Sequence, residues 1–348
     1  MRREKSVLTL LAGVALFSSA CAFVQPDARV PGDATGNPDK FAWETLVDIG
    51  RSAHNGSQDA IWETWALSQD VYVHSGLPVF PMPSHHPLVL RRPAVLAARS
   101  PIQKPPDGKT QEIRMNREAF DYIVANNLWN QRGQLAWFDK RMPVSVPKGA
   151  IEIKAEWKAI AEGDKPIYHW NVDGQGNTWG LIALHVTTKD LPNWFWATFE
   201  HIKNEHRCEI NGCNDTFGVD ANKKPTRQWL NFLRDHGMGD EWTYYRLTGS
   251  QTDFVDSTGA PLRLGNSEIE GVQGLMEKSS CISCHAQSRM SREGFALPHA
   301  SLGVPVADCF KGQMQMDFMW SLGEPWDASL PPLPCEVVPQ SKDSPHPQ

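Results

Sequence analysis

The sequence predicts an α+β protein with N-terminal helices, a central antiparallel sheet and a mainly helical segment near the C-terminus. Apolar residues recur at helical spacing in the first third of the chain, and from about residue 149 the pattern changes to the alternation typical of strands. A capping motif at Asn266, with Glu270 behind it and helically spaced apolar residues following, predicts the C-terminal helix.

The first third of the chain is predicted to contain three helices. Asn37 and Pro38 begin the first, since proline is tolerated at the first helical position. A second is predicted to begin near Asp59, and Asn116 is the expected N-cap of the third. Residues 77–109 are rich in proline and basic side chains, so we expect a long surface excursion between the second and third helices.

The central part of the chain is predicted to be a sheet. Residues 151–157 alternate apolar and polar side chains, as a half-buried strand does. The runs at 181–186 and 194–199 are rich in β-branched and aromatic residues and are joined by residues 187–193. We therefore expect a hairpin or the centre of a sheet there.

Composition and charge exclude two classes of protein. The 348 residues include 34 basic and 40 acidic side chains, a formal net charge of -6, and 41% of the residues are hydrophobic. A nucleic-acid-binding protein normally carries a basic excess, and a wholly disordered chain is poorer in apolar residues. We expect a folded protein with no nucleic-acid partner.

The first 22 residues have the pattern of an export signal: a basic start, a short apolar run from Val7 to Phe17, and small residues up to Ala22. The apolar run is too short to span a bilayer. The small residues before Cys21 fit a lipoprotein signal, in which the thiol is acylated, and Ala20-Cys21-Ala22 also fits ordinary cleavage. Both routes place the mature protein in the bacterial periplasm, with the membrane reached only through a lipid anchor.

The strongest chemical motif is Cys281-Ile-Ser-Cys284-His285. C-x-x-C-H is the arrangement of covalent c-type haem attachment. The two thiols form thioethers with one porphyrin, and the adjacent imidazole is the proximal iron ligand. We therefore expect one haem c per chain, held by Cys281 and Cys284, with His285 on the iron.

Two other interpretations of the motif stay open. A redox-active thiol pair is expected at the start of a helix in a βαβ pattern, which is not the pattern here. A zinc site needs a second ligand pair at similar spacing, and Cys208 and Cys213 are four residues apart. The remaining cysteines favour the disulfides Cys208–Cys213 and Cys309–Cys335, with free buried thiols as the alternative.

The distal iron ligand is predicted less sharply than the proximal one. Phe195, Ala197, Phe199 and His201 share one face of an alternating strand, so His201 is the candidate distal ligand that we favour. The other candidates are His185, one of three C-terminal methionines, and an open distal position. The methionines are Met314, Met316 and Met319.

Several segments together resemble a widespread bacterial family of exported proteins known as c-type cytochrome-like. The resemblance covers roughly residues 40–322 and implies a haem c protein, without supplying a reaction. It is carried by the following segments: Arg114-Met-Asn116 with Asn126-Asn127, Ile153-Lys-Ala-x-Trp157, Asn193-Trp-Phe-Trp-Ala-Thr-Phe-Glu-His201, Ser280-Cys-x-x-Cys-His285 and Asp317-Phe-Met-Trp-Ser321.

These observations predict a periplasmic or membrane-tethered haem protein that transfers electrons to or from a redox partner protein. A haem enzyme of the peroxidase or oxidase type, or a haem-based sensor, is the alternative if the distal position is open. The expected organisation is an export signal (1–22), a linker (23–36), an α+β domain (37–263), a haem-binding segment packed on the sheet (264–325) and a tail (326–348).

Overall fold

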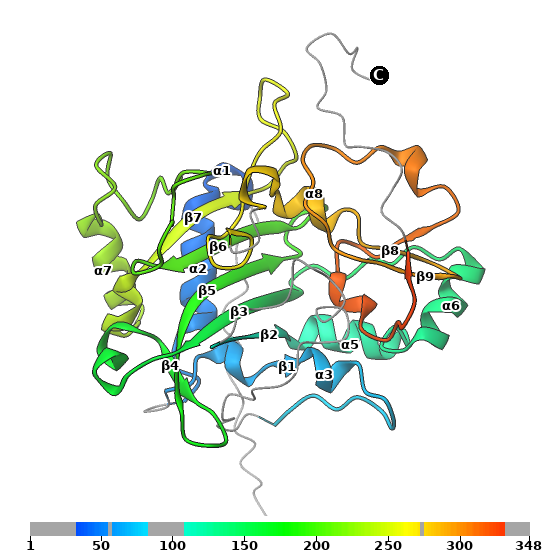
Figure 1. Ribbon diagram of the computed structural model, residues 1–348, viewed down its shortest axis with the longest axis horizontal. Helices are drawn as coiled ribbons and strands as arrows, with labels where there is room; N and C mark the ends of the chain where they lie inside the picture. The colour runs from blue at the N-terminus through cyan, green and yellow to red at the C-terminus, as the bar shows by residue number, and fades with distance from the viewer. Residues whose placement is uncertain (1–32, 55–57, 83–107, 272–274, 331–348) are drawn as a thin grey trace, which may run out of the picture.

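A seven-stranded antiparallel sheet forms the centre of the protein. The computed structural model describes residues 33–54, 58–82, 108–271 and 275–330 (Figure 1). The strand order is β1-β2-β3-β5-β6-β7, and β4 pairs with β5. The strands are β1 (Ala66–Leu67), β2 (Lys109–Met115), β3 (Ile151–Ala159), β4 (Trp170–Val172), β5 (Thr178–Thr188), β6 (Phe195–His201) and β7 (Tyr245–Gln251). The mixed helix and sheet content confirms the predicted α+β class, and β5 and β6 pair as the expected hairpin.

Helices lie around this sheet and at its ends. The α-helices before the C-terminal segment are α1 (Asp33–Gly36), α2 (Pro38–Gly50), α3 (Ser68–Val71), α5 (Arg117–Ala125), α6 (Gln131–Lys140) and α7 (Arg227–Asp235). Shorter 3-10 helices are η1 (Ile61–Thr64), η2 (Glu162–Ile167) and η3 (Asp240–Tyr244). In Figure 1, α2 crosses behind the sheet, α7 lies at one end, and α5 and α6 lie at the other.

The alternation along β3 separates the two faces of the sheet. Ile153 and Trp157 point to the face covered by α2, where they join a core that also contains Phe41, Phe195 and Phe199. The helix α2 begins as predicted, because the Asn37 side chain accepts a hydrogen bond from the Lys40 amide at 3.2 Å.

The C-terminal segment covers the opposite face of the sheet. Its elements are η5 (Met276–Lys278), α8 (Cys281–His285), β8 (Arg289–Ser291), β9 (Gly294–Ala296), η6 (Ala307–Phe310), β10 (Met314–Gln315), η7 (Trp320–Gly323) and β11 (Ser329–Leu330). A second core joins Ile282 and Trp320 of this segment to Trp196 of β6 and Phe120 of α5. The segment therefore packs on the sheet, as predicted, and shares its core with it.

Four predictions about local structure are wrong. The C-terminal segment is not mainly helical: α8 has five residues, and the second sheet has the order β10-β8-β9-β11. The helix expected near Asp59 is the short 3-10 helix η1, followed by β1. Residues 33–36 of the expected linker form α1, and Lys109, at the end of the expected excursion, begins β2. Residues 83–107 and the expected export signal lie outside the described residues.

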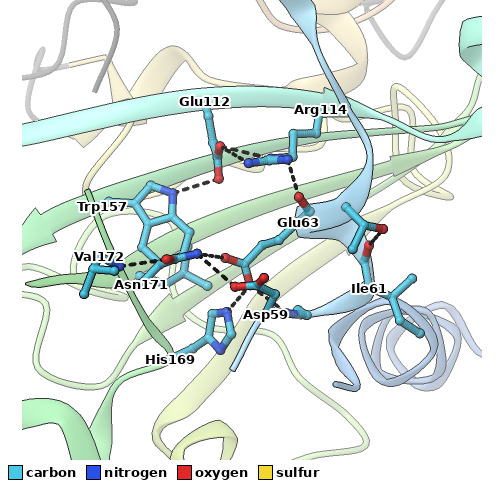
Figure 2. A network of polar contacts seen from close by, with 12 residues as sticks. Asp59, Ile61, Glu63, Glu112, Arg114, Trp157, His169, Asn171 and Val172 are labelled. Atoms are coloured by element: carbon cyan, nitrogen blue, oxygen red, sulfur yellow. Dashed lines mark hydrogen bonds and ion pairs between the residues drawn. The ribbon is translucent and has the colours of Figure 1, made fainter. Parts of the chain in front are cut away.

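A buried polar network fastens η1 to the sheet (Figure 2). The Glu63 carboxylate lies 2.6 Å from Nε2 of His169 and accepts a hydrogen bond from the Asn171 side chain at 2.7 Å. Arg114 donates to the Glu63 carbonyl and pairs with Glu112 at 2.9 Å. Burial alone would raise the pKa of Glu63, but the adjacent His169 holds that pKa below its usual value.

Candidate functional site

The cysteine–histidine motif is held at the start of α8 by the end of β7. Ser280 is the N-cap of α8, and its hydroxyl accepts a hydrogen bond from the Gln251 side chain at 2.8 Å. The carbonyl oxygen of the same Gln251 side chain accepts from the Ile282 amide at 3.2 Å. A single buried glutamine on the sheet therefore fixes the helix that carries both thiols and the imidazole.

Both thiols and the imidazole line one cavity between α8 and the sheet. The cavity has a volume of about 90 Å³, below the ~300–1,000 Å³ usual for cofactor and small-molecule pockets. Its lining residues are Ile113, Glu152, Lys154, His185, Thr187, Trp196, Ala197, Glu270, Leu275, Ser279, Cys281, Cys284, His285, Pro298, Ala300, Trp320, Ser321 and Glu324. The structure thus brings the three predicted attachment residues together and aims them at one space.

His285 is held in a single tautomer. Its Nδ1 lies 2.7 Å from the Phe318 carbonyl oxygen. Because a carbonyl can only accept, Nδ1 donates, and the neutral imidazole keeps a lone pair on Nε2. Burial lowers the pKa of His285 to about 4, so the ring is neutral at physiological pH. A neutral, oriented imidazole is the form that binds a metal ion.

A strained turn presents that carbonyl to His285. Asp317 and Phe318 have φ values of +47° and +67°, in the left-handed region that side chains other than glycine rarely adopt. The Asp317 carboxylate holds the turn in place, because it accepts hydrogen bonds from the Val146 amide at 2.7 Å and from the Lys189 ammonium at 2.6 Å. Such strain is typical of positions that the surrounding structure fixes for function.

The polar face of the sheet forms the opposite wall of the cavity. Glu152 and Lys154 of β3 and His185 and Thr187 of β5 all contribute to this wall. Burial raises the pKa of Glu152 to about 7. The alternation at 151–157 predicted the polar positions, but it could not indicate that a distant segment covers them. The sequence pattern indicates Glu270 only as a residue at the start of a helix. In the structure it also lines the cavity.

The two thiols are not disulfide-bonded to each other. Burial raises the pKa of Cys284 to about 12 and the pKa of Cys281 well above its usual value. A redox-active pair depends on a lowered thiol pKa, so this environment disfavours that interpretation. Among the described residues, no group of three or more His, Cys, Asp or Glu side chains is arranged to hold a metal ion.

The structure does not bring His201 to the cavity, so the favoured distal ligand has to be corrected. Its ring stacks on Tyr168 with centroids 3.8 Å apart, and its Nε2 lies 2.8 Å from the Ile167 carbonyl oxygen. His201 follows Ala197 by four residues, about 13 Å along a strand. Phe195 and Phe199, the apolar face that suggested it, pack in the core on the α2 side.

The three candidate methionines also lie away from the cavity wall. Met314, Met316 and Met319 are buried in the second core, and none is among the described residues that line the cavity. Of the side chains proposed from the sequence as distal ligands, His185 alone is in that lining.

The disulfide predictions are tested in part. Cys208 and Cys213 form a disulfide, with Cα atoms 4.9 Å apart. Cys309 is disulfide-bonded, and Cys335, its expected partner, lies outside the described residues, as does Cys21.

Within the described ranges, no helix has the length and apolar character needed to cross a membrane. Comparisons of the chain with protein-family models, with curated proteins and with solved structures found no match. The resemblance to c-type cytochrome-like proteins therefore stays a prediction.

Proposed function

We propose that this chain is an exported c-type haem protein that transfers electrons. The observation that carries the proposal is the fixed tautomer of His285, whose Nδ1 donates to the Phe318 carbonyl while the ring lines the same cavity as Cys281 and Cys284. The five-residue motif is a match of sequence alone. The orientation of the His285 imidazole comes from the structure, and it is a second, independent feature expected of a ligand to haem iron.

The residues around the cavity fit a haem. Both ring nitrogens of His185 are buried without a hydrogen-bond partner among the described residues, although the cavity wall is polar. Buried polar groups in folded proteins normally have partners. The Glu270 carboxylate lies 3.3 Å from Nε2 of His185, so Nδ1 is the nitrogen left for a missing ligand. Trp196 adds an apolar wall, its ring 4.5 Å from the His285 ring.

Each attachment residue has a defined role in the proposal. Cys281 and Cys284 hold the porphyrin edge through thioether bonds, and His285 binds the iron through Nε2. A bound haem supplies a one-electron couple at the iron. Trp196 and Trp320 line the cavity, and an apolar shell of this kind limits the access of water to a bound group.

The attachment is tested by substitution in a bacterial host that matures c-type haem. The Cys281→Ala/Cys284→Ala variant is expected to lose covalent haem staining after denaturing electrophoresis. His285→Ala is expected to alter the iron spectrum of the native protein. Cys208→Ala/Cys213→Ala is the matched control, because it removes two cysteines from elsewhere in the fold and is expected to keep the haem. Covalent haem in the first variant, or stoichiometric zinc without iron in the wild type, would contradict the proposal.

Electron transfer is tested by spectroscopy of the same preparation. A six-coordinate, low-spin haem in both redox states, reduced and reoxidised by small mediators, is the expected result. High-spin ferric haem that reacts rapidly with peroxide would instead support the enzyme interpretation. The redox partner would be sought as a periplasmic protein, because the first 22 residues are proposed to direct export, with or without a lipid anchor at Cys21.

A further inference from the structure

We propose that His185 of β5 is the sixth iron ligand and that Glu270 positions its imidazole. This inference rests on the proposed haem site. It replaces His201 with a side chain that lines the same cavity as His285, and it predicts a haem with a nitrogen ligand on each side of the iron.

The strand register brings His185 close to His285. His185 pairs with Thr198 on β6, so Trp196, two residues away, is its diagonal neighbour. Diagonal neighbours on one face of a sheet lie roughly 7–8 Å apart. The Trp196 ring in turn lies 4.5 Å from the His285 ring. One tryptophan therefore borders both imidazoles, and both line the same cavity.

His185 lacks the partners that a buried histidine normally has. Neither ring nitrogen makes a hydrogen bond within the described part of the chain, and both are buried. A buried polar group without a hydrogen bond destabilises the fold. In His201 and His169 a ring nitrogen lies at hydrogen-bond distance from an oxygen, the Ile167 carbonyl at 2.8 Å and the Glu63 carboxylate at 2.6 Å, whereas the Glu270 carboxylate approaches His185 only to 3.3 Å.

Glu270 fixes one end of the His185 ring. Its Oε1 lies 3.3 Å from Nε2 of His185, at ion-pair distance though outside hydrogen-bond geometry, and its Oε2 accepts the Asn266 amide at 2.7 Å. A carboxylate beside a ligating histidine sets the tautomer and makes the other ring nitrogen a stronger donor to the metal. Because Nε2 of His185 lies beside Glu270, Nδ1 is the nitrogen that remains to bind the iron.

Lys154 is the rival nitrogen ligand on the same wall. It is the cross-strand neighbour of His185 and lines the cavity. An ammonium has no lone pair, so coordination by Lys154 would require the loss of a proton, whereas a neutral imidazole binds directly. Lys154→Met is therefore the second variant of the test.

The spin state of the haem in the matured protein tests whether His185 is the sixth iron ligand. His185→Ala is expected to convert a low-spin, six-coordinate haem to a high-spin, five-coordinate one, with an unchanged pyridine haemochrome. Added imidazole is expected to restore the low-spin spectrum. His201→Ala, a buried histidine outside the cavity, is the matched control and is expected to stay low-spin. An unchanged spectrum in His185→Ala, or a loss of the low-spin form in Lys154→Met, would overturn the inference.

The two proposals fail in distinguishable ways. Absence of covalent haem in the wild type would refute the haem site itself. Covalent haem with a spectrum that does not depend on His185 would refute only the ligand. If His185→Ala does not accumulate, His185→Met retains a ligand of similar size and is expected to give a methionine-ligated spectrum with a higher reduction potential.

Glu270 is tested by the reduction potential. Glu270→Gln is expected to keep the low-spin spectrum and to raise the potential, because a less electron-rich imidazole favours ferric iron less. A tenfold change in relative affinity for the two oxidation states corresponds to a shift of about 59 mV. Glu270→Asp is expected to restore part of the shift. A potential equal to that of the wild type in Glu270→Gln would remove Glu270 from the proposal.

Discussion

Phe318 adopts a left-handed backbone conformation that a bulky residue rarely takes, and its carbonyl is the acceptor for His285. Two such residues in succession cost of order 1–3 kcal/mol each, so the turn needs support from elsewhere. Asp317 provides it through the Val146 amide and the Lys189 ammonium. The orientation of the His285 imidazole therefore depends on an aspartate that acts only through the turn.

We expect Asp317→Ala to destabilise the protein by about 2–4 kcal/mol, because it frees the strained turn and removes the carboxylate partner of the Lys189 ammonium, which keeps its hydrogen bond to the Pro192 carbonyl. The same variant is expected to raise the reduction potential of the matured protein, since His285 loses a fixed acceptor. Urea unfolding and a redox titration measure the two effects.

Asp121→Ala is the matched control for stability. Asp121 pairs with Arg117, and both side chains are more than half exposed, at 53% and 59%. Exposed pairs contribute at most about 1 kcal/mol. Equal unfolding midpoints for the two variants would show that Asp317 does not support the turn.

At the scale of single elements, Asn116 joins a helix to a strand. Its side-chain oxygen accepts the Ala119 amide of α5 at 3.2 Å and the Ile151 amide of β3 at 3.0 Å, and its amide donates to the Gly149 carbonyl at 2.8 Å. Three contacts from one side chain fix the angle at which the chain enters α5 and returns to β3.

Asn116→Ala is expected to lower the free energy of unfolding by about 2–3 kcal/mol, more than the ~1 kcal/mol usual for a helix cap, because the strand contacts are lost as well. Asn130→Ala, which removes the cap of α6 without a contact to the sheet, is the control and is expected to cost about 1 kcal/mol. Equal losses in the two variants would mean that the strand contacts of Asn116 contribute nothing.

Elements with local signals could be predicted from the sequence. Asn37 and Asn116 cap α2 and α5 as expected, and the alternation at 151–157 is the core of β3. The helix predicted after Asn266 is a turn at residues 267–270, although its cap forms, since the Glu270 carboxylate accepts a hydrogen bond from the Asn266 amide at 2.7 Å. The same capping residues also bond to the sheet. Asn266 donates to the Thr198 hydroxyl at 2.9 Å, and Ser267 bonds to Glu200. Side chains of this kind compete with helix formation, and no local pattern shows which partner wins.

The place of His201 in the fold could not be predicted for a geometric reason. The alternation counted from Phe195 to His201 is real, because the register shift between β6 and β7 falls on Thr248 of β7 and the pairing of β6 with β5 is regular. The apolar residues counted on that face also pack toward α2, because they complete a core made by residues more than a hundred positions earlier in the sequence. Which face of a strand meets a cofactor depends on the layer that covers it.

At the scale of the whole molecule, residues 264–325 and the sheet share one core. Ile282, Met316 and Trp320 lie in the same buried cluster as Trp194 and Trp196. Hydrogen bonds from Lys189 to Asp317 and from Gln134 to the Leu322 carbonyl also cross the boundary. Neither part retains a complete core without the other.

We therefore expect the matured protein to unfold in one transition. Haem absorbance and tryptophan fluorescence should give the same urea midpoint, as expected for a single cooperative unit. Limited proteolysis of the native protein should not release a folded, haem-containing fragment that begins near residue 264. Separate midpoints, or such a fragment, would show that residues 264–325 form an independent domain.

The burial of the two thiols bears on how the protein is assembled. In the folded chain Cys281 and Cys284 lie inside the cavity, and burial holds both thiols in the un-ionised form. A planar macrocycle could enter only if α8 moved away from the sheet, which would break the hydrogen bonds of Gln251 to Ser280 and Ile282. Under the proposed function, haem attachment thus precedes the docking of the segment on the sheet, and the folded chain is the product of that order. A chain that folds before it meets its cofactor would close over its own attachment site.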